Sequence, residues 1–164
     1  IQVGSGGGGD VFGGDGGGCV WIEASDAVTL QGTITANGGN YSRFSAAHGG
    51  GGGAGGGILL SGASIAGGAT AKLTADGGAC MLGLCGGGGG GRIAVWLTLW
   101  ERSRGRLLAG ELPQWVVMSG SHSDYQGTTS VAPGAGDTNN GVPETGTIVF
   151  VTDVGQTGAL MQVR

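Results

Sequence analysis

The sequence GGGGGGRIAVWL, residues 86–97, joins an unbroken run of glycines to a short apolar string. Glycine loses the most backbone entropy of any residue when it becomes ordered, and it brings no side chain to bury. Forty-three of the 164 residues are glycine, and further runs occupy 6–9, 16–18, 49–53 and 55–57. Such a chain is either disordered or uses its bare backbone as packing material.

The remaining composition favours an ordered chain. Hydrophobic residues make up 39% of the sequence and charged residues only 11%, whereas disordered chains combine low hydrophobicity with high charge. The net charge of −4 gives no electrostatic reason to expect nucleic acid as a partner. No apolar stretch approaches the roughly 20 residues that a membrane-spanning helix needs. We therefore predict a single folded domain over residues 1–164 without a membrane span.

The apolar strings recur along the chain. Two of them are followed by the related sequences TANGG at 35–39 and TADGG at 74–78, at an offset of 39 residues. A fixed period of this length is the signature of a repeat architecture. The strings are short and rich in Val, Ile, Thr and Trp, which is typical of strands. We place the units at about 6–48, 49–85 and 86–145, with an insertion at 101–126 and a partial unit at 146–164.

The pattern within a unit predicts an all-β fold. Val28, Leu30 and Ile34 alternate with polar residues, as in a strand with one buried and one solvated face. Helical signals are weak, and we expect at most one helical turn, within 99–112. The fold is either a short-strand β-solenoid or a stacked β-sandwich. The glycine runs are excursions between strands, formed either by left-handed turns or by packed threefold helices resembling polyglycine II.

Cysteines and one sequence motif bear on the compartment. Cys80 and Cys85 flank a short apolar loop, where a disulfide would stabilise the fold by about 2 kcal/mol. Cys19 lies in an apolar string, and we expect a buried free thiol there. Asn40 begins an Asn-Tyr-Ser triplet that matches an N-glycosylation acceptor. The possible disulfide and glycan together favour an extracellular or cell-surface chain.

No constellation in the sequence supports catalysis or metal binding. His122, Ser123 and Asp124 are neighbours in sequence, but catalytic triads converge from separate elements, so we interpret them as a polar loop. The three arginines within 102–106 are interpreted as part of a solvated loop. The many Gly-x-Gly-x-x-Gly matches follow from composition and lack the helix that a phosphate site requires. We expect no enzymatic activity, no cofactor and no bound metal.

The glycine run leading into GRIAVW at 91–96, preceded by TADGG at 74–78, resembles the glycine-rich repeats of large secreted or cell-surface proteins of environmental bacteria. Copies in that family commonly close on a Gly-Thr-Ile strand with an aromatic residue, and residues 146–150 are similar. The resemblance covers most of residues 4–152. It implies an extracellular, repetitive β scaffold and gives no catalytic residues to carry over.

These observations predict a structural subunit of an extracellular fibre, assembling with copies of itself as a homopolymer through strand edges and glycine-rich packing. The alternative is a glycan- or surface-binding adhesin module, similar to a phage-fibre tip or an ice-binding protein. Aromatic residues and short terminal strands are the candidate contacts to a partner subunit or carbohydrate: Trp100, Trp115, Ile1, Val3, Leu160 and Val163.

Overall fold

The computed structural model describes residues 2–9, 12–41, 50–80, 85–99, 101–114, 116–137, 139 and 141–154. Over this part of the chain the structure consists of short strands and one short helix. The β-rich class predicted from the sequence is therefore confirmed. No described helix has the length and apolar character needed to cross a membrane.

The strands form three sheets. The first has the order β1-β4-β7-β10-β8, the second pairs β2 with β5, and the third has the order β3-β6-β9. All pairings are parallel except that of β8 with β10. The bounds are β1 Cys19–Glu23, β2 Ala27–Leu30, β3 Thr33–Thr35, β4 Gly57–Gly62, β5 Ser64–Gly67, β6 Lys72–Thr74, β7 Arg92–Leu97, β8 Val116–Ser119, β9 Thr128–Ser130 and β10 Thr147–Asp153.

Paired strands come from successive stretches of the sequence. Cys19 lies opposite Gly57, and Thr33 lies opposite Lys72, close to the 39-residue offset of the sequence repeat. We call β1–β3 the first unit, β4–β6 the second unit, and β7 with β9 the third unit. The third unit is interrupted between its two strands by the helix α1, Glu101–Leu108, and by β8. The chain then continues into β10, which pairs with β7.

The hydrophobic core lies between the sheets. Its most deeply buried side chains include Ile58, Leu60, Leu73, Ile93 and Val95. They alternate with outward-facing positions, as in β7, where every second residue is buried. In the first unit Val28, Leu30 and Ile34 pack against this core while their polar neighbours are exposed. The alternation read from the sequence is thus present in the structure.

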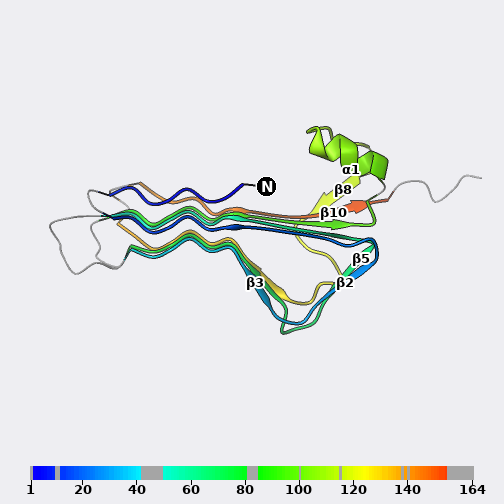
Figure 1. Cartoon of the computed structure of the whole chain (residues 1–164), viewed down its shortest axis with the longest axis horizontal. Coiled ribbons are helices and arrows are strands. Elements are labelled where there is room, and N and C mark those ends of the chain that lie inside the picture. Colours follow the sequence, from blue (N-terminus) through cyan, green and yellow to red (C-terminus); the bar gives the residue numbers. More distant parts are fainter. Residues whose placement is uncertain are drawn as a thin grey trace, which may run out of the picture.

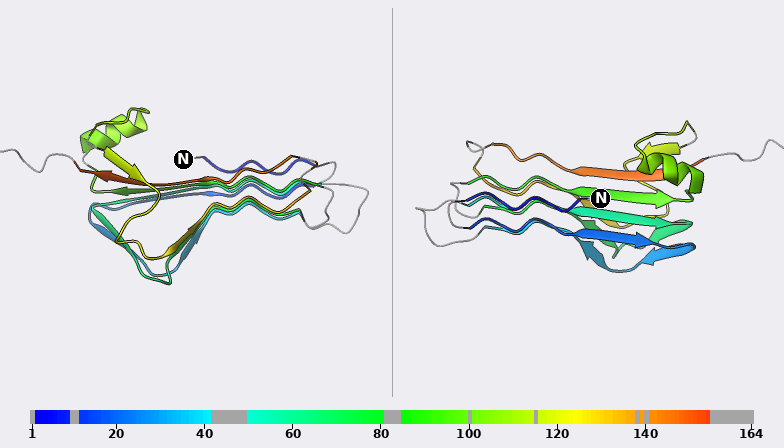
Figure 2. Two further views of the ribbon diagram at one scale, coloured as in Figure 1. Left: turned by 180° about the vertical axis from the view of Figure 1, so that it is seen from behind. Right: turned by 45° about the horizontal axis from the view of Figure 1, so that its top comes forward.

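Long extended segments leave the strands on one side and run next to one another (Figures 1 and 2). We call these segments the glycine arm. Some lead into the strands of the first sheet, others return from the third sheet, and residues 2–9 lie along the arm as an additional segment. The described segments of the arm are 2–9, 12–18, 36–41, 50–57, 75–80, 85–91, 131–137 and 141–146.

Backbone hydrogen bonds in the arm repeat every third residue. Along 50–57, successive N–H groups point to three different neighbouring segments and then return to the first. The N–H···O distances are 2.7–3.0 Å, from Gly51 to Gly8, Gly52 to Gly86, Gly53 to Gly39, Ala54 to Ser5, Gly55 to Gly89, and Gly56 to Ala36. One segment therefore joins three neighbours through its donors alone, without help from side chains.

Close approach of the segments explains the purity of the glycine runs. A Cβ atom added to Gly53, Gly78 or Gly88 would overlap backbone atoms of an adjoining segment. At the surface of the arm the restriction ends, since a Cβ on Gly8 or Gly18 would meet nothing. Glycine is thus required inside the arm by packing.

The expectation of at most one helical turn within 99–112 is wrong, because α1 spans eight residues. Its acidic residue Glu101 lies in the first turn and Arg106 in the last, which suits the helix dipole. Ser103 is buried and donates to Asp153 of β10 at 2.5 Å. Gly110, at φ +80°, follows the helix end. Tertiary contact and end charges offset the low propensity of Gly105.

Candidate functional site

One end of the molecule presents unpaired strand edges. Among the described residues, β1 pairs only with β4, β2 only with β5, and β3 only with β6. All three strands of the first unit are therefore edge strands. We call this surface the open end. Exposed edges are templates for pairing with another chain, so the open end is the candidate functional site.

The backbone of β1 points alternately toward β4 and toward the open end. Ala24 donates to Ser61, and Gly18 accepts from Gly57, so the even-numbered residues of β1 face β4. In a parallel strand the intervening residues direct their N–H and C=O groups to the other side. Cys19, Trp21 and Glu23 thus direct their backbone groups to the open end. The third sheet repeats this pattern. Ala36 donates to Thr74 of the second unit, so the backbone groups of the odd-numbered residues Thr33 and Thr35 point toward the open end.

Side-chain oxygens link the returning segments of the arm from unit to unit. Asn37 Oδ1 accepts from the N–H of Asp76 at 2.8 Å, and Asn40 Oδ1 accepts from the N–H of Ala79 at 2.7 Å. Asp76 Oδ1 in turn accepts from Ala132 N–H at 2.7 Å and from the hydroxyl of Ser130 at 2.5 Å. We call this series the acceptor ladder. It explains why Asn and Asp occupy the same place in TANGG and TADGG.

The opposite end of the first sheet has β8 as its edge strand among the described residues. β8 runs antiparallel along β10, with Phe150 opposite Ser119 and Asp153 opposite Val116. The insertion that the sequence places at 101–126 therefore supplies a strand to the sheet as well as a helix. We call this side, formed by β8, β10 and β9, the far end.

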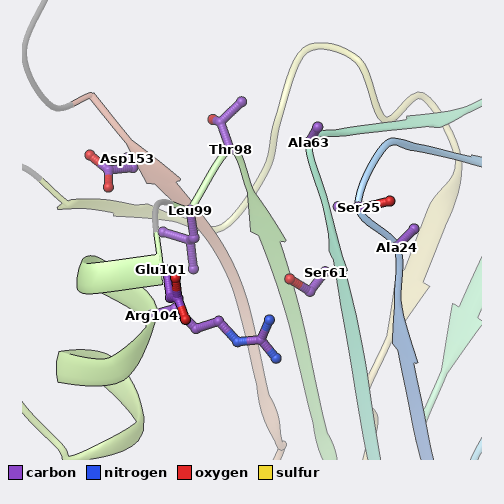
Figure 3. Close-up of a pocket in the computed structure, with 10 residues that line it drawn as sticks. Ala24, Ser25, Ser61, Ala63, Thr98, Leu99, Glu101, Arg104 and Asp153 are labelled. Carbon is purple, nitrogen blue, oxygen red and sulfur yellow. The ribbon is translucent and has the colours of Figure 1, made fainter.

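A cavity of about 760 Å³ lies beside α1 at the carboxyl ends of the strands (Figure 3). Two of its charged residues have identified partners: Arg104 forms an ion pair with Glu23, and Asp153 accepts from Ser103. The lining comprises Ala24, Ser25, Ser61, Gly62, Ala63, Thr98, Leu99, Glu101, Arg104 and Asp153.

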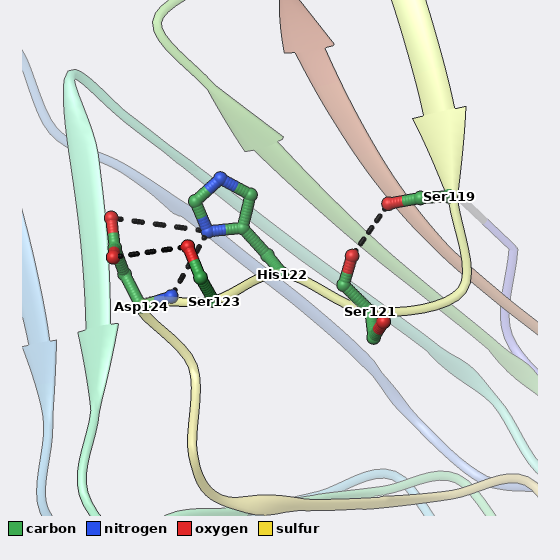
Figure 4. A network of polar contacts seen from close by, with 5 residues as sticks. All are labelled: Ser119, Ser121, His122, Ser123 and Asp124. Carbon is green, nitrogen blue, oxygen red and sulfur yellow. Dashed lines mark hydrogen bonds and ion pairs between the residues drawn. The ribbon is translucent and has the colours of Figure 1, made fainter.

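The side chains of the polar loop predicted at 122–124 hydrogen-bond within the loop (Figure 4), while its backbone carbonyl at Asp124 accepts from Gly67 N–H and the His122 ring stacks on Phe150. The backbone N–H of Asp124 donates to His122 Nδ1 at 3.3 Å, and Ser123 Oγ donates to Asp124 Oδ1 at 3.3 Å. His122 Nδ1 lies 3.9 Å from Asp124 Oδ2. The serine thus hydrogen-bonds the carboxylate and not the imidazole, so this is not the relay of a catalytic triad.

The structure places some predicted site residues and leaves others outside its description. Val3 is exposed on the arm segment 2–9, Asn40 is exposed, and Cys80 is joined to Cys85 by a disulfide with a Cα–Cα distance of 5.7 Å. The remaining predicted contacts lie outside the described residues: Ile1, Trp100, Trp115, Leu160 and Val163.

Two interpretations of single elements are wrong. Cys19 is exposed, because its side chain lies on the outer face of β1 at an uncovered edge, and not in the core. The three arginines lie on α1 and not in a loop, and Arg104 is engaged by Glu23. Glu23 lies on a separate strand far from Arg104 in the sequence, so no local pattern could predict the ion pair.

Sequence reasoning missed Trp21 as a contact residue. Its side chain is 51% exposed at the open end, and its indole N–H donates to Glu23 at 3.0 Å. The sequence carries no signal for this, because Trp21 has the parity of Cys19, which the apolar string places in the core. Among the described residues no three metal-ligating side chains come together. Burial raises the pKa of Tyr125 above its usual value, and its hydroxyl donates to Thr128 O at 3.2 Å.

Comparison with protein-family models, with curated proteins and with solved structures finds no match to this chain.

Proposed function

We propose that this chain is a structural segment of an extracellular fibre, joined to neighbouring repeat units through the open end. The observation that carries the proposal is that β1, β2 and β3 are edge strands on the same side of the molecule. Natural proteins usually protect such edges with charge, proline or a covering element. Here the edge carries the exposed Trp21 and Cys19 beside Glu23, whose charge is paired with Arg104, so a partner would bury a mainly apolar surface.

The architecture supports a load-bearing role. We interpret the parallel, repeated strands as a short β-solenoid, and the arm, with its three-residue hydrogen-bond period, as a bundle of helices like polyglycine II. Solenoid units contact only their neighbours and bury a continuous core by stacking. The glycine arm adds a second packing region, which is held by backbone contacts and lies beside the stacked strands. Both features suit a rigid structural element.

Association through the open end can be tested by sedimentation and electron microscopy of the purified full chain. We expect association that grows with concentration and that is strongly reduced in Trp21→Lys, which places a charge on the edge. Trp21→Pro serves as a second variant, because it removes a donor that points away from β4 and leaves the β1–β4 bonds intact. A chain that stays monomeric at all concentrations, and whose behaviour neither variant changes, would contradict the proposal.

A glycan- or surface-binding module is the second candidate. The outer face of β3, β6 and β9 carries the hydroxyl-bearing residues Thr33, Thr35, Thr74, Thr128 and Ser130 in neighbouring rows, and Trp21 is accessible for stacking on a sugar ring. This reading predicts binding to immobilised glycans or to an ordered surface that Trp21→Ala or Thr35→Ala weakens. Binding unaffected by both variants would exclude it.

A further inference from the structure

The acceptor ladder begins at the open end with two N–H donors for which the described residues supply no acceptor. The N–H groups of Asp76 and Ala79 in the second unit are bound by the side chains of Asn37 and Asn40 in the first. The backbone N–H groups of Asn37 and Asn40 occupy the same places one unit earlier. Among the described residues nothing accepts a hydrogen bond from either. A preceding unit with side-chain oxygens at these two places would satisfy both donors.

The far end of this chain lacks those oxygens. Thr128 lies opposite Lys72, so Ala132 takes the place of Asp76 in the third unit and Ala135 takes the place of Ala79. An alanine side chain accepts no hydrogen bond, so the series through Asn40 ends at Ala79 in the second unit, and the series through Asn37 and Asp76 ends at Ala132. The same end has the edge of β10 covered by β8. The edge strand of the first sheet at this end is therefore β8, which runs antiparallel to the strands of the open end. Together with the missing oxygens, this makes the far end a poor partner for the open end of another copy.

We propose that the open end binds a glycine-rich repeat unit that carries Asn or Asp at the places of Asn37 and Asn40, and that the far end of a second copy does not fulfil this role. The proposal rests on the function proposed above and names the chemistry of the partner. Stacking is directional as a consequence: units add at the open end, and the far end terminates the stack. An interface of this kind selects its partner by leaving buried donors unpaired when the wrong unit binds.

A duplication within the full chain supplies such a unit. A second copy of residues 12–49, inserted before Phe12, has the length that separates Cys19 from Gly57, so it can stack on the first unit in the native register. The matched control carries Asn37→Ala and Asn40→Ala in the added copy only, which reproduces the alanines of the third unit. Amide hydrogen exchange, measured by NMR, then reports on the original Asn37 and Asn40.

We expect exchange at the original Asn37 and Asn40 to slow by about tenfold or more in the duplicated chain relative to the control, as for a gained hydrogen bond in a packed site. Exchange at Cys19 and Trp21 should slow in both chains, which shows that the added unit is stacked. Equal exchange at Asn37 and Asn40 in the two chains, with the unit stacked, would overturn the assignment of the ladder. Failure of the added unit to stack would overturn the proposal as a whole.

The unmodified chain tests the far end separately. We expect its association to stop at small closed species, because only the open end is available. Regular filaments of the unmodified chain would support the fibre function but overturn the directional stacking, because they require the far end to accept a copy. Absence of any association, together with the expected exchange pattern in the duplicated chain, would support the ladder and count against self-association.

Discussion

The strand region and the glycine arm are held together in different ways. In the strand region Leu60, Ile93 and Val95 are almost completely buried, and side-chain burial stabilises it by roughly 25 cal/mol for each Å² of apolar surface. In the arm the contacts are between backbones, with N–H groups of 50–57 bonded to three neighbours in turn. Each such bond contributes only about 0.5–1.5 kcal/mol net, so many must act together.

This difference shows which substitutions each region can accept. A side-chain core tolerates replacement by another apolar residue of similar volume, because the packing can readjust. The arm has no side chains to readjust, so a single added methyl group meets a rigid backbone. The strand region therefore constrains volume and polarity, whereas the arm constrains the presence of a Cβ atom at defined positions.

The largest effect is expected from a cavity in the strand region. Leu60 is fully buried between the sheets, and Leu60→Ala should lower the free energy of unfolding by about 2–5 kcal/mol. Leu60→Met, which nearly conserves volume, should lower it by less than about 1.5 kcal/mol. Urea denaturation followed by tryptophan fluorescence measures both. Equal losses in the two variants would contradict the view that volume is the constraint in this region.

Two adjacent glycines test the corresponding claim for the arm. A Cβ on Gly88 would overlap backbone atoms of Gly53, whereas a Cβ on Gly89 would lie 3.5 Å from the nearest atom. Gly88→Ala should therefore destabilise the chain by about 1–3 kcal/mol. Gly89→Ala should be neutral or stabilising by up to about 1 kcal/mol, through lower entropy of the unfolded chain.

The comparison uses the same denaturation experiment, and the two variants share composition, charge and position in one run. If Gly89→Ala is as damaging as Gly88→Ala, the run is needed for backbone conformation and not for close approach. That outcome would remove the proposed distinction between the two regions.

The acceptor ladder connects the regions and should have an intermediate effect. Asp76 Oδ1 accepts from Ala132 N–H and from Ser130 Oγ, and Asp76→Ala leaves both donors without this partner. We expect a loss of about 1–3 kcal/mol. Asp76→Asn retains the oxygen and should cost less than about 0.5 kcal/mol. A similar loss in both variants would indicate that the negative charge matters and not the acceptor.

The sequence was sufficient to predict the repeated strands and their spacing. Alternation over Val28–Ile34 and the TANGG and TADGG motifs are local patterns, and the strand at 147–153 contains a glycine-bounded apolar string. The role of Asn37 and Asp76 as acceptors for the next unit could not be predicted, because it depends on the register in which the units stack.

The helix α1 and the exposure of Cys19 show the same limit. Eight residues containing Gly105 have weak helical propensity, and the helix is retained through the contact of Ser103 with Asp153 on a strand distant in sequence. Cys19 sits in an apolar string, but the string forms an edge strand whose outer face is uncovered. In both cases the decisive contact, present or missing, is long-range.

The smallest expected effect concerns Tyr125, which links the insertion to the core. Burial raises its pKa above 10.0 in the folded chain, and the unfolded chain has the ordinary value near 10. Near and above pH 10 the folded state therefore holds more protons than the unfolded state at the same pH. For this reason the free energy of unfolding falls as the pH increases through this range. Tyr125→Phe removes this dependence. The difference in unfolding free energy between the two proteins should therefore be constant below about pH 9 and should shift in favour of the variant above pH 10.

A difference that stays constant through this range would show that the hydroxyl is as well solvated in the folded chain as in the unfolded one, and that the insertion does not close over the core at β9.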